Sequence, residues 1–214
     1  MPSLVRVVDS ALPPALFSRL ARSVRALGGE NLRDTYQTTF WFDLGEPATV
    51  VEEAVLALRG HYPRRIAGVE WWLSRMRTSD VRVDFHQDCD ERLLRREGRL
   101  VHPARSSVLF LNRCRGGLLA VTDQPACDTN PARAPDDLGA LDLVRPWPNR
   151  FALFPGDATH GVLDAKGAVP LRRLRPATPL RLAVAVNAWT ARPTGVPTFT
   201  GAGRYAGLRS PRRR

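Results

Sequence analysis

The sequence predicts a mainly β domain that is preceded by helices. The first 68 residues carry helical patterns, whereas residues 69–190 carry short β-branched and aromatic runs separated by turn residues. Many short strands at this spacing are typical of a sandwich or a barrel and not of a parallel sheet. We therefore expect a single domain over residues 1–190, followed by a basic and flexible tail over residues 191–214.

Two helices are expected in the N-terminal part. Apolar residues recur at steps of four, four and three over residues 16–27, which gives a helix one apolar face. Asp9 or Ser10 can cap this helix at its start. A second helix is expected over residues 47–59, and the segment 38–42 between the two helices is expected to be a strand.

Eight further strands are expected in the C-terminal part, and two proline-rich connections interrupt them. The connections span residues 124–149 and 164–179, and loops of this length are usually functional lids or disordered segments. The candidate strands are Val69–Arg77, Val81–His86, Ser106–Asn112, Leu118–Thr122, Asp142–Arg145, Phe151–Phe154, Gly161–Leu163 and Arg181–Trp189.

The net charge of +11 comes almost entirely from arginine. All but one of the 32 basic residues are arginine, and Lys166 is the exception. Such a preference is typical of codon choice in a GC-rich genome and not of a surface selected to bind nucleic acid. Six of the arginines lie in residues 191–214, which contain no acidic residue. We therefore expect no nucleic-acid partner, and a basic groove is the alternative.

The composition predicts a cytoplasmic protein. Apolar residues make up 43% and charged residues 25% of the 214 residues, which is ordinary for a soluble domain. No apolar run approaches the roughly 18 residues that span a bilayer, and no secretory pattern opens the chain. Cys89, Cys114 and Cys127 form no CxxC pair, which fits a reducing compartment.

Histidines provide the clearest functional pattern. His86 and Asp88 lie two residues apart, so on a strand or its exit they point to the same side. His160 can supply a third ligand, and two histidines with one carboxylate leave three positions open, as non-heme Fe(II) requires. A surface turn is the alternative for the His-x-Asp pair. The other two histidines, His61 and His102, are expected at the surface.

Taken together, the motifs resemble the Fe(II)- and 2-oxoglutarate-dependent oxygenases, and especially their prolyl-hydroxylase-like branch. The resemblance covers about residues 70–189, and its parts occur in the order that the family has. The segments that carry it are His86-x-Asp88, residues 107–112 with Gly116-Gly117, residues 149–156 leading to His160, and residues 181–189.

This resemblance implies a double-stranded β-helix, a relative of the jelly-roll and cupin folds. It also implies that His86, Asp88 and His160 hold Fe(II), and that the enzyme uses 2-oxoglutarate and O₂. The implied reaction is the hydroxylation of an unactivated C–H bond, with release of succinate and CO₂. Because the carboxylate at Asp88 is present, hydroxylation is favoured over halogenation.

The resemblance assigns the tail of 2-oxoglutarate to Arg181, on the last expected strand. In this family the basic residue often follows the distal histidine by about ten positions, whereas Arg181 follows His160 by 21. An insertion over residues 164–179 explains the difference, and its own arginines are rivals for the role. These rivals are Arg172, Arg173 and Arg175.

Two asparagines on expected core strands, Asn112 and Asn187, are further candidates for the cofactor pocket. A buried amide is unusual unless it is hydrogen-bonded. By alternation Asn187 shares the face of Arg181, so it either lines the pocket or makes a structural bond.

We expect an enzyme that acts on a small-molecule or amino-acid-like substrate. One alternative is an oxygenase acting on a protein or a nucleic acid, and another is a non-catalytic cupin-like binding module. The family's nucleic-acid demethylases carry two arginines six apart on the last strand, whereas Asn187 stands six residues after Arg181 here. The sequence makes no prediction about the oligomeric state.

Overall fold

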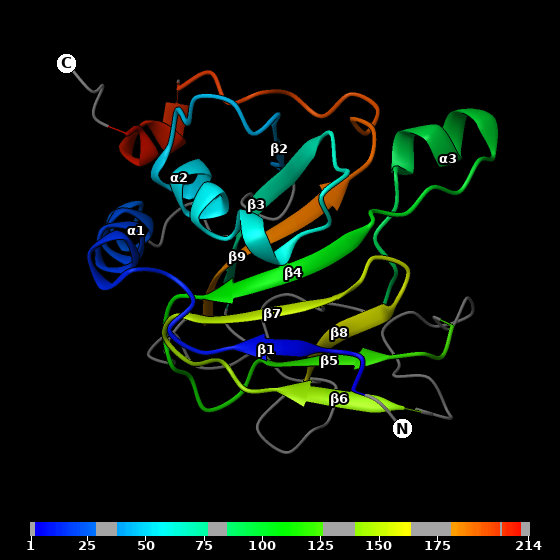
Figure 1. The fold of residues 1–214 in the computed structure, drawn as a ribbon, viewed down its shortest axis with the longest axis horizontal. Coiled ribbons are helices and arrows are strands. Elements are labelled where there is room, and N and C mark those ends of the chain that lie inside the picture. The colour runs from blue at the N-terminus through cyan, green and yellow to red at the C-terminus, as the bar shows by residue number, and fades with distance from the viewer. Residues whose placement is uncertain are drawn as a thin grey trace.

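Two antiparallel β-sheets form the body of the protein, and the two N-terminal helices lie on one side of them (Figure 1). No helix in the described parts of the chain is long and apolar enough to cross a membrane. The computed structural model describes residues 3–28, 38–76, 85–125, 140–163, 181–201 and 203–210.

The larger sheet has six strands in the order β1-β7-β4-β9-β3-β2, and the smaller has three in the order β6-β5-β8. The strands of the larger sheet are β1 (Arg6–Val8), β2 (Phe40–Phe42), β3 (Gly68–Met76), β4 (Arg105–Phe110), β7 (Arg150–Pro155) and β9 (Arg181–Trp189). Those of the smaller sheet are β5 (Leu118–Thr122), β6 (Leu141–Val144) and β8 (Thr159–Leu163).

The sequence prediction of a mainly β protein with N-terminal helices is confirmed. Seven of the eight strands expected after residue 68 are present, with ends within two residues of those predicted. In the eighth, Val81–His86, residues 81–84 lie outside the described part, and His86 forms an isolated bridge with His160.

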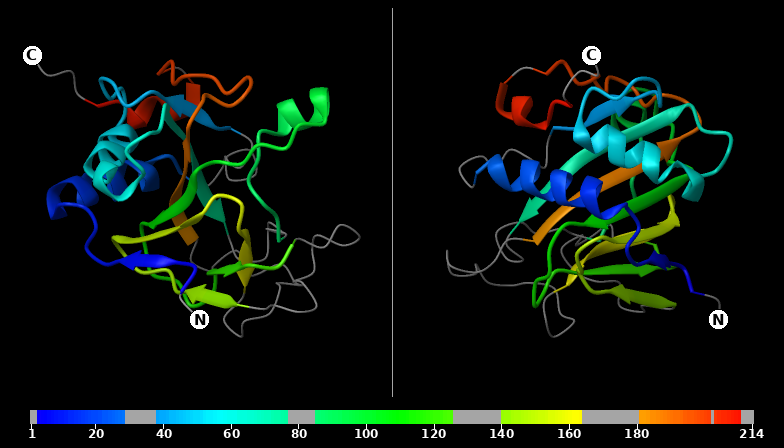
Figure 2. Two further views of the ribbon diagram at one scale, coloured as in Figure 1. Left: turned by 45° about the vertical axis from the view of Figure 1, so that its right-hand side comes forward. Right: turned by 60° about the vertical axis from the view of Figure 1, so that its left-hand side comes forward.

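Helices α1 (Pro14–Ala26) and α2 (Val50–Ala57) cover the outer face of the larger sheet (Figure 2). The expected cap of α1 is wrong, because its N-cap is Pro13 and makes no side-chain bond. Asp9 instead pairs with Arg150, at 2.7 Å between its Oδ1 and the arginine Nε. Helix α2 is shorter than predicted, because a capping box starts it at Thr49. The short 3-10 helix η2 (Arg59–His61) follows it.

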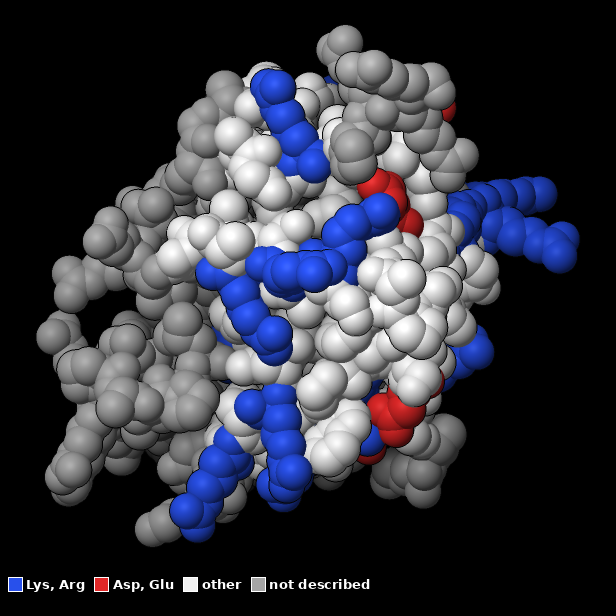
Figure 3. Space-filling view, turned by 90° about the vertical axis from the view of Figure 1, so that its left-hand side faces the viewer, with Lys and Arg blue, Asp and Glu red and all other residues white. Residues whose placement is uncertain are grey.

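Basic side chains are spread over the side of the molecule that carries α1. Figure 3 shows most of them as separate side chains on a largely uncharged surface, interrupted by acidic groups. The basic side chains of the described residues therefore do not form one continuous patch on this side of the molecule.

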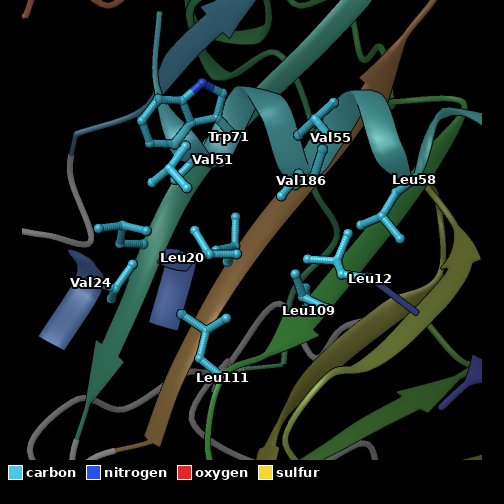
Figure 4. Close-up of a cluster of buried hydrophobic side chains, with 14 of the residues drawn as sticks. Leu12, Leu20, Val24, Val51, Val55, Leu58, Trp71, Leu109, Leu111 and Val186 are labelled. Atoms are coloured by element: carbon cyan, nitrogen blue, oxygen red, sulfur yellow. The ribbon is translucent and has the colours of Figure 1, made fainter. Parts of the chain in front are cut away.

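The main hydrophobic core lies between the helices and the larger sheet (Figure 4). Leu20 of α1 and Val51 of α2 are fully buried there, against Trp71 of β3 and Val186 of β9. Because side chains alternate along a strand, the odd-numbered residues of β9 face the other way. There Ala183 belongs to a second core that joins β4, β7 and β9 to the smaller sheet.

A helix that the sequence analysis did not predict, α3 (Glu91–Glu97), connects the His86 segment to β4. The Asp90 side chain caps it by accepting a hydrogen bond from the Leu93 amide at 2.9 Å. Gly98 ends it with a φ of 64°, the left-handed conformation that glycine adopts most easily. An Asp-to-Gly interval of this kind is the sequence signal that could have found it.

The expected flexible tail is wrong as far as Ser210. Phe199 contacts Phe40 edge-on, with ring centroids 5.4 Å apart. The 3-10 helix η3 (Gly203–Leu208) packs on α1, and Leu208 is fully buried. The few apolar residues of this basic segment thus complete the helical layer. Residues 211–214 lie outside the described part.

Candidate metal centre

His86, Asp88 and His160 meet between the two sheets. His86 and His160 pair through two backbone hydrogen bonds, of 3.0 and 2.9 Å, at the edge of β8. The Nε2 atom of His86 lies 3.6 Å from Asp88 Oδ1, and that of His160 lies 3.5 Å from Asp88 Oδ2. One ligand atom from each residue lies within 4.8 Å of the other two, so one ion can contact all three.

The protonation states of His160 and Asp88 suit a divalent metal. Burial lowers the pKa of His160, which favours a neutral ring. Its Nδ1 lies 3.1 Å from the Ala158 carbonyl oxygen and donates to it, which leaves the Nε2 lone pair for a ligand. Burial alone would raise the pKa of Asp88, but the two histidines and Ser106 hold it well below its usual value. Neutral imidazoles and an ionised carboxylate are the forms that bind Fe(II).

Two residues that the sequence analysis did not select hold Asp88 in place. The Ser106 hydroxyl donates to Asp88 Oδ2 at 2.8 Å. The Nδ1 atom of His102 lies 2.7 Å from the backbone carbonyl oxygen of Asp88. The surface position expected for His102 is wrong, because the residue is only partly exposed beside the site.

Arg181 lines the same cavity as the three candidate ligands. The cavity has a volume of about 50 Å³, and Trp72 and Phe154 also contribute to its wall. Arg181 is 2% exposed, and it donates to the Gly117 carbonyl at 3.0 Å and to Ser74 Oγ at 2.9 Å. A buried guanidinium therefore faces the space next to the candidate metal ligands.

The two predicted asparagines lie in different surroundings. Asn187 is 3% exposed and lines the cavity that contains Arg181. Asn112 does not line this cavity, and its Oδ1 accepts a hydrogen bond from the Leu182 amide at 2.9 Å. The rival arginines predicted in the 164–179 connection lie outside the described residues.

A larger cleft of about 670 Å³ shares His86, Asp88 and Asn187 with this cavity. Glu70 of β3 lines it, together with residues of α3 and of the 193–197 segment. Burial raises the pKa of Glu70 to about 7, the charge of Asp88 adds to the rise, and contacts with Thr39 and Trp189 oppose it. The sequence analysis missed Glu70, because a single Glu on an expected strand carries no signal.

No protein-family model matches the chain, and no curated protein matches its sequence. Among solved structures, HygX from Streptomyces hygroscopicus, with nickel and 2-oxoglutarate bound, is 14% identical to the chain. The match covers 92% of this chain and 85% of HygX, with a TM-score of 0.51. The chain has the fold of HygX. The resemblance to the 2-oxoglutarate oxygenases is thereby confirmed at the level of the fold.

Two further structures are similar at lower scores. A prolyl-4-hydroxylase from Pseudomonas putida is 17% identical, and the match covers 87% of this chain and 92% of that protein, with a TM-score of 0.47. The non-heme alpha-ketoglutarate-dependent epimerase SnoN from nogalamycin biosynthesis is 16% identical, over 94% and 88% of the two chains, also with a TM-score of 0.47.

Proposed function

We propose that the protein is an Fe(II)- and 2-oxoglutarate-dependent oxygenase. It would hydroxylate an unactivated C–H bond of a small-molecule or amino-acid-like substrate and release succinate and CO₂. The observation that carries this proposal is the convergence of His86, Asp88 and His160 in one cavity with a buried Arg181. The finding that HygX, which shares the fold, binds 2-oxoglutarate supports it.

In this proposal the core is a double-stranded β-helix, and the helices belong to the same domain. The two sheets share a hydrophobic core, which includes Phe110 of β4 and Val121 of β5. The helices share another with the opposite face of the larger sheet. Neither layer buries its apolar face without the other, so the parts are expected to fold together.

The donor set fits Fe(II), because two neutral imidazoles and one carboxylate are the ligands of a non-heme iron with open positions. His86 and His160 would bind through Nε2, and Asp88 through its carboxylate. When bound, iron and 2-oxoglutarate supply the oxidation by O₂, which side chains alone do not perform.

Other residues of the chain position the reactants and exclude water. Arg181 presents a planar fork of N–H donors, which matches a carboxylate in a bidentate pair. Ser106 orients Asp88, and the Ala158 carbonyl fixes the tautomer of His160. The side chains of Trp72 and Phe154 in the cavity wall keep water away from the reacting groups.

Anaerobic titration tests the site. Addition of Fe(II) and 2-oxoglutarate to the metal-free protein is expected to produce the weak visible charge-transfer band of a chelated 2-oxo acid. His160→Ala should abolish the band, because one of three ligands is lost. His61→Ala is the matched control, because His61 packs against Phe151 and is not one of the three ligands. Retention of the band in His160→Ala would overturn the assignment.

Substrate class requires a turnover measurement. Succinate release in air, screened over amino acids, other small metabolites, peptides and oligonucleotides, is expected to rise only with members of the first two groups. Stimulation by oligonucleotides alone would contradict this choice of substrate.

A further inference from the structure

A row of polar side chains leads from the candidate metal centre into the neighbouring cleft, and the proposed reaction does not use the two that line the cleft, Asn187 and Glu70. Strand pairing places Ser106 of β4 opposite Asn187 of β9, and Asn187 opposite Glu70 of β3. Residues directly opposite each other in antiparallel strands point to the same face of the sheet. The row therefore runs from Ser106, which bonds the ligand Asp88, outward to Glu70 in the cleft.

The middle member of this row has an unmet hydrogen-bonding requirement. Asn187 is 3% exposed, and no donor among the described residues reaches its Oδ1. A buried acceptor without a partner is unfavourable, so a ligand donor is expected there. The carboxylates and the keto group of 2-oxoglutarate offer only acceptors at neutral pH. Among the reactants of the proposed function, only the substrate can therefore supply this donor.

Glu70 supplies a negative charge at the same place. No lysine or arginine of the described residues forms an ion pair with it. Its hydrogen-bond partners, Thr39 and Trp189, carry no charge. By contrast, Glu91 pairs with Arg95 at 3.2 Å, and Asp90 accepts two backbone hydrogen bonds, one at the start of α3 and one from Thr194. Burial raises the pKa of Glu70, and the nearby charges of Asp88 and Asp90 add to the rise.

We propose that Glu70 and Asn187 bind a protonated amine of the substrate, with the carboxylate as its counter-charge and the amide oxygen as a second acceptor. This inference rests on the proposed function, and it narrows the substrate to small molecules that carry an ammonium group. An ammonium has three donors, so it satisfies both acceptors at once. A hydroxyl group would supply one donor and no charge, and it would leave the charge of the partly buried Glu70 uncompensated.

Paramagnetic relaxation in the Mn(II)- and 2-oxoglutarate-loaded protein tests the inference at pH 8 without turnover. The probes are cyclohexylmethylamine, its N-acetyl derivative and cyclohexylmethanol, which have the same ring but differ in charge. Protons of the amine are expected to relax faster on binding near Mn(II), and the two neutral probes are expected to bind about tenfold more weakly or worse. Equal binding of the three probes would overturn the proposal.

Variants of the cleft residues show which side chains bind the amine. Glu70→Gln should weaken amine binding about tenfold, whereas Glu91→Gln, on the rim of the same cleft, should not change it. Asn187→Asp, which keeps an acceptor, should retain amine binding, and Asn187→Leu should lose it even if Glu70→Gln folds poorly. A similar loss in Glu70→Gln and Glu91→Gln would overturn the proposal, because it would show a general effect of charge.

The same samples separate this inference from the function on which it rests. If Mn(II) or 2-oxoglutarate fails to bind, the proposed function is refuted and the inference falls with it. If both bind and the amine shows no preference, only the amine subsite is refuted.

Discussion

Removal of the Ser106 hydroxyl should weaken metal binding without removing a ligand. The hydroxyl donates to Asp88 Oδ2 at 2.8 Å, and Ser106 is only 1% exposed, so water cannot replace the bond in Ser106→Ala. A hydrogen bond to a charged group contributes about 1.5–3 kcal/mol. The bond keeps the carboxylate ionised and directed at the histidines. Its loss should therefore lower metal affinity roughly 10- to 100-fold, as for other residues that orient a ligand.

The matched control is the neighbouring serine. Ser107 is 2% exposed, and its Oγ bonds the Val186 carbonyl at 2.8 Å and the Tyr62 hydroxyl at 3.0 Å. Ser107→Ala removes the same buried group and should reduce stability to a similar extent, but it should leave metal affinity unchanged. Competition with a chromogenic chelator for Fe(II), under argon, measures both variants. Equal affinities in Ser106→Ala and the wild type, or equal losses in the two variants, would refute the reasoning.

Three further perturbations test other parts of the structure. Arg181→Ala should weaken 2-oxoglutarate binding to the metal-loaded protein by roughly 2–5 kcal/mol, as measured by calorimetry. Arg181→Lys should recover only part of this binding energy. Unchanged affinity in Arg181→Ala would refute the assignment of Arg181 to the 2-oxoglutarate carboxylate. Gly156→Ala should lower the free energy of unfolding in urea by roughly 2–3 kcal/mol, because a Cβ there would lie 1.9 Å from the Pro103 carbonyl oxygen. Gly60→Ala is the control and should not destabilise the fold, because the space around Gly60 is open. Because the pKa of Glu70 is raised to about 7, the metal-free protein should lose about 3 kcal/mol of unfolding free energy as the pH rises from 4.5 to 8, relative to Glu70→Gln; parallel pH profiles of the two proteins would contradict this.

The strands and the three candidate ligands could be predicted because their signals are local or are spaced in a known order. Short apolar and β-branched runs bounded by turn residues marked β5 and β9 with the bounds that the structure has. The two-residue spacing of His86 and Asp88 fixes their common side before any fold is known. The expectation that His160 joins them needed the order of the family's motifs, because no local pattern links residues 72 positions apart.

Sequence patterns failed where a residue's surroundings come from distant parts of the chain. Composition alone predicted a flexible C-terminal tail, yet Leu208 is buried in the core that the helices share with the larger sheet, because tertiary packing brings η3 against α1. Asn112 and Asn187 are the same residue type on expected strands, but one bonds a backbone amide and the other lines the cleft.

The sequence by itself determined the period of the strands and the shared side of two candidate metal ligands, His86 and Asp88, since both depend on short-range order along the chain. Tertiary structure alone decided which polar residues stand beside them. The register of β3, β4 and β9 aligns Glu70, Asn187 and Ser106 into one row, and a shift of one residue would turn each side chain to the opposite face. That register is set by the cores on both faces of the larger sheet, and their packing involves residues from the whole length of the chain.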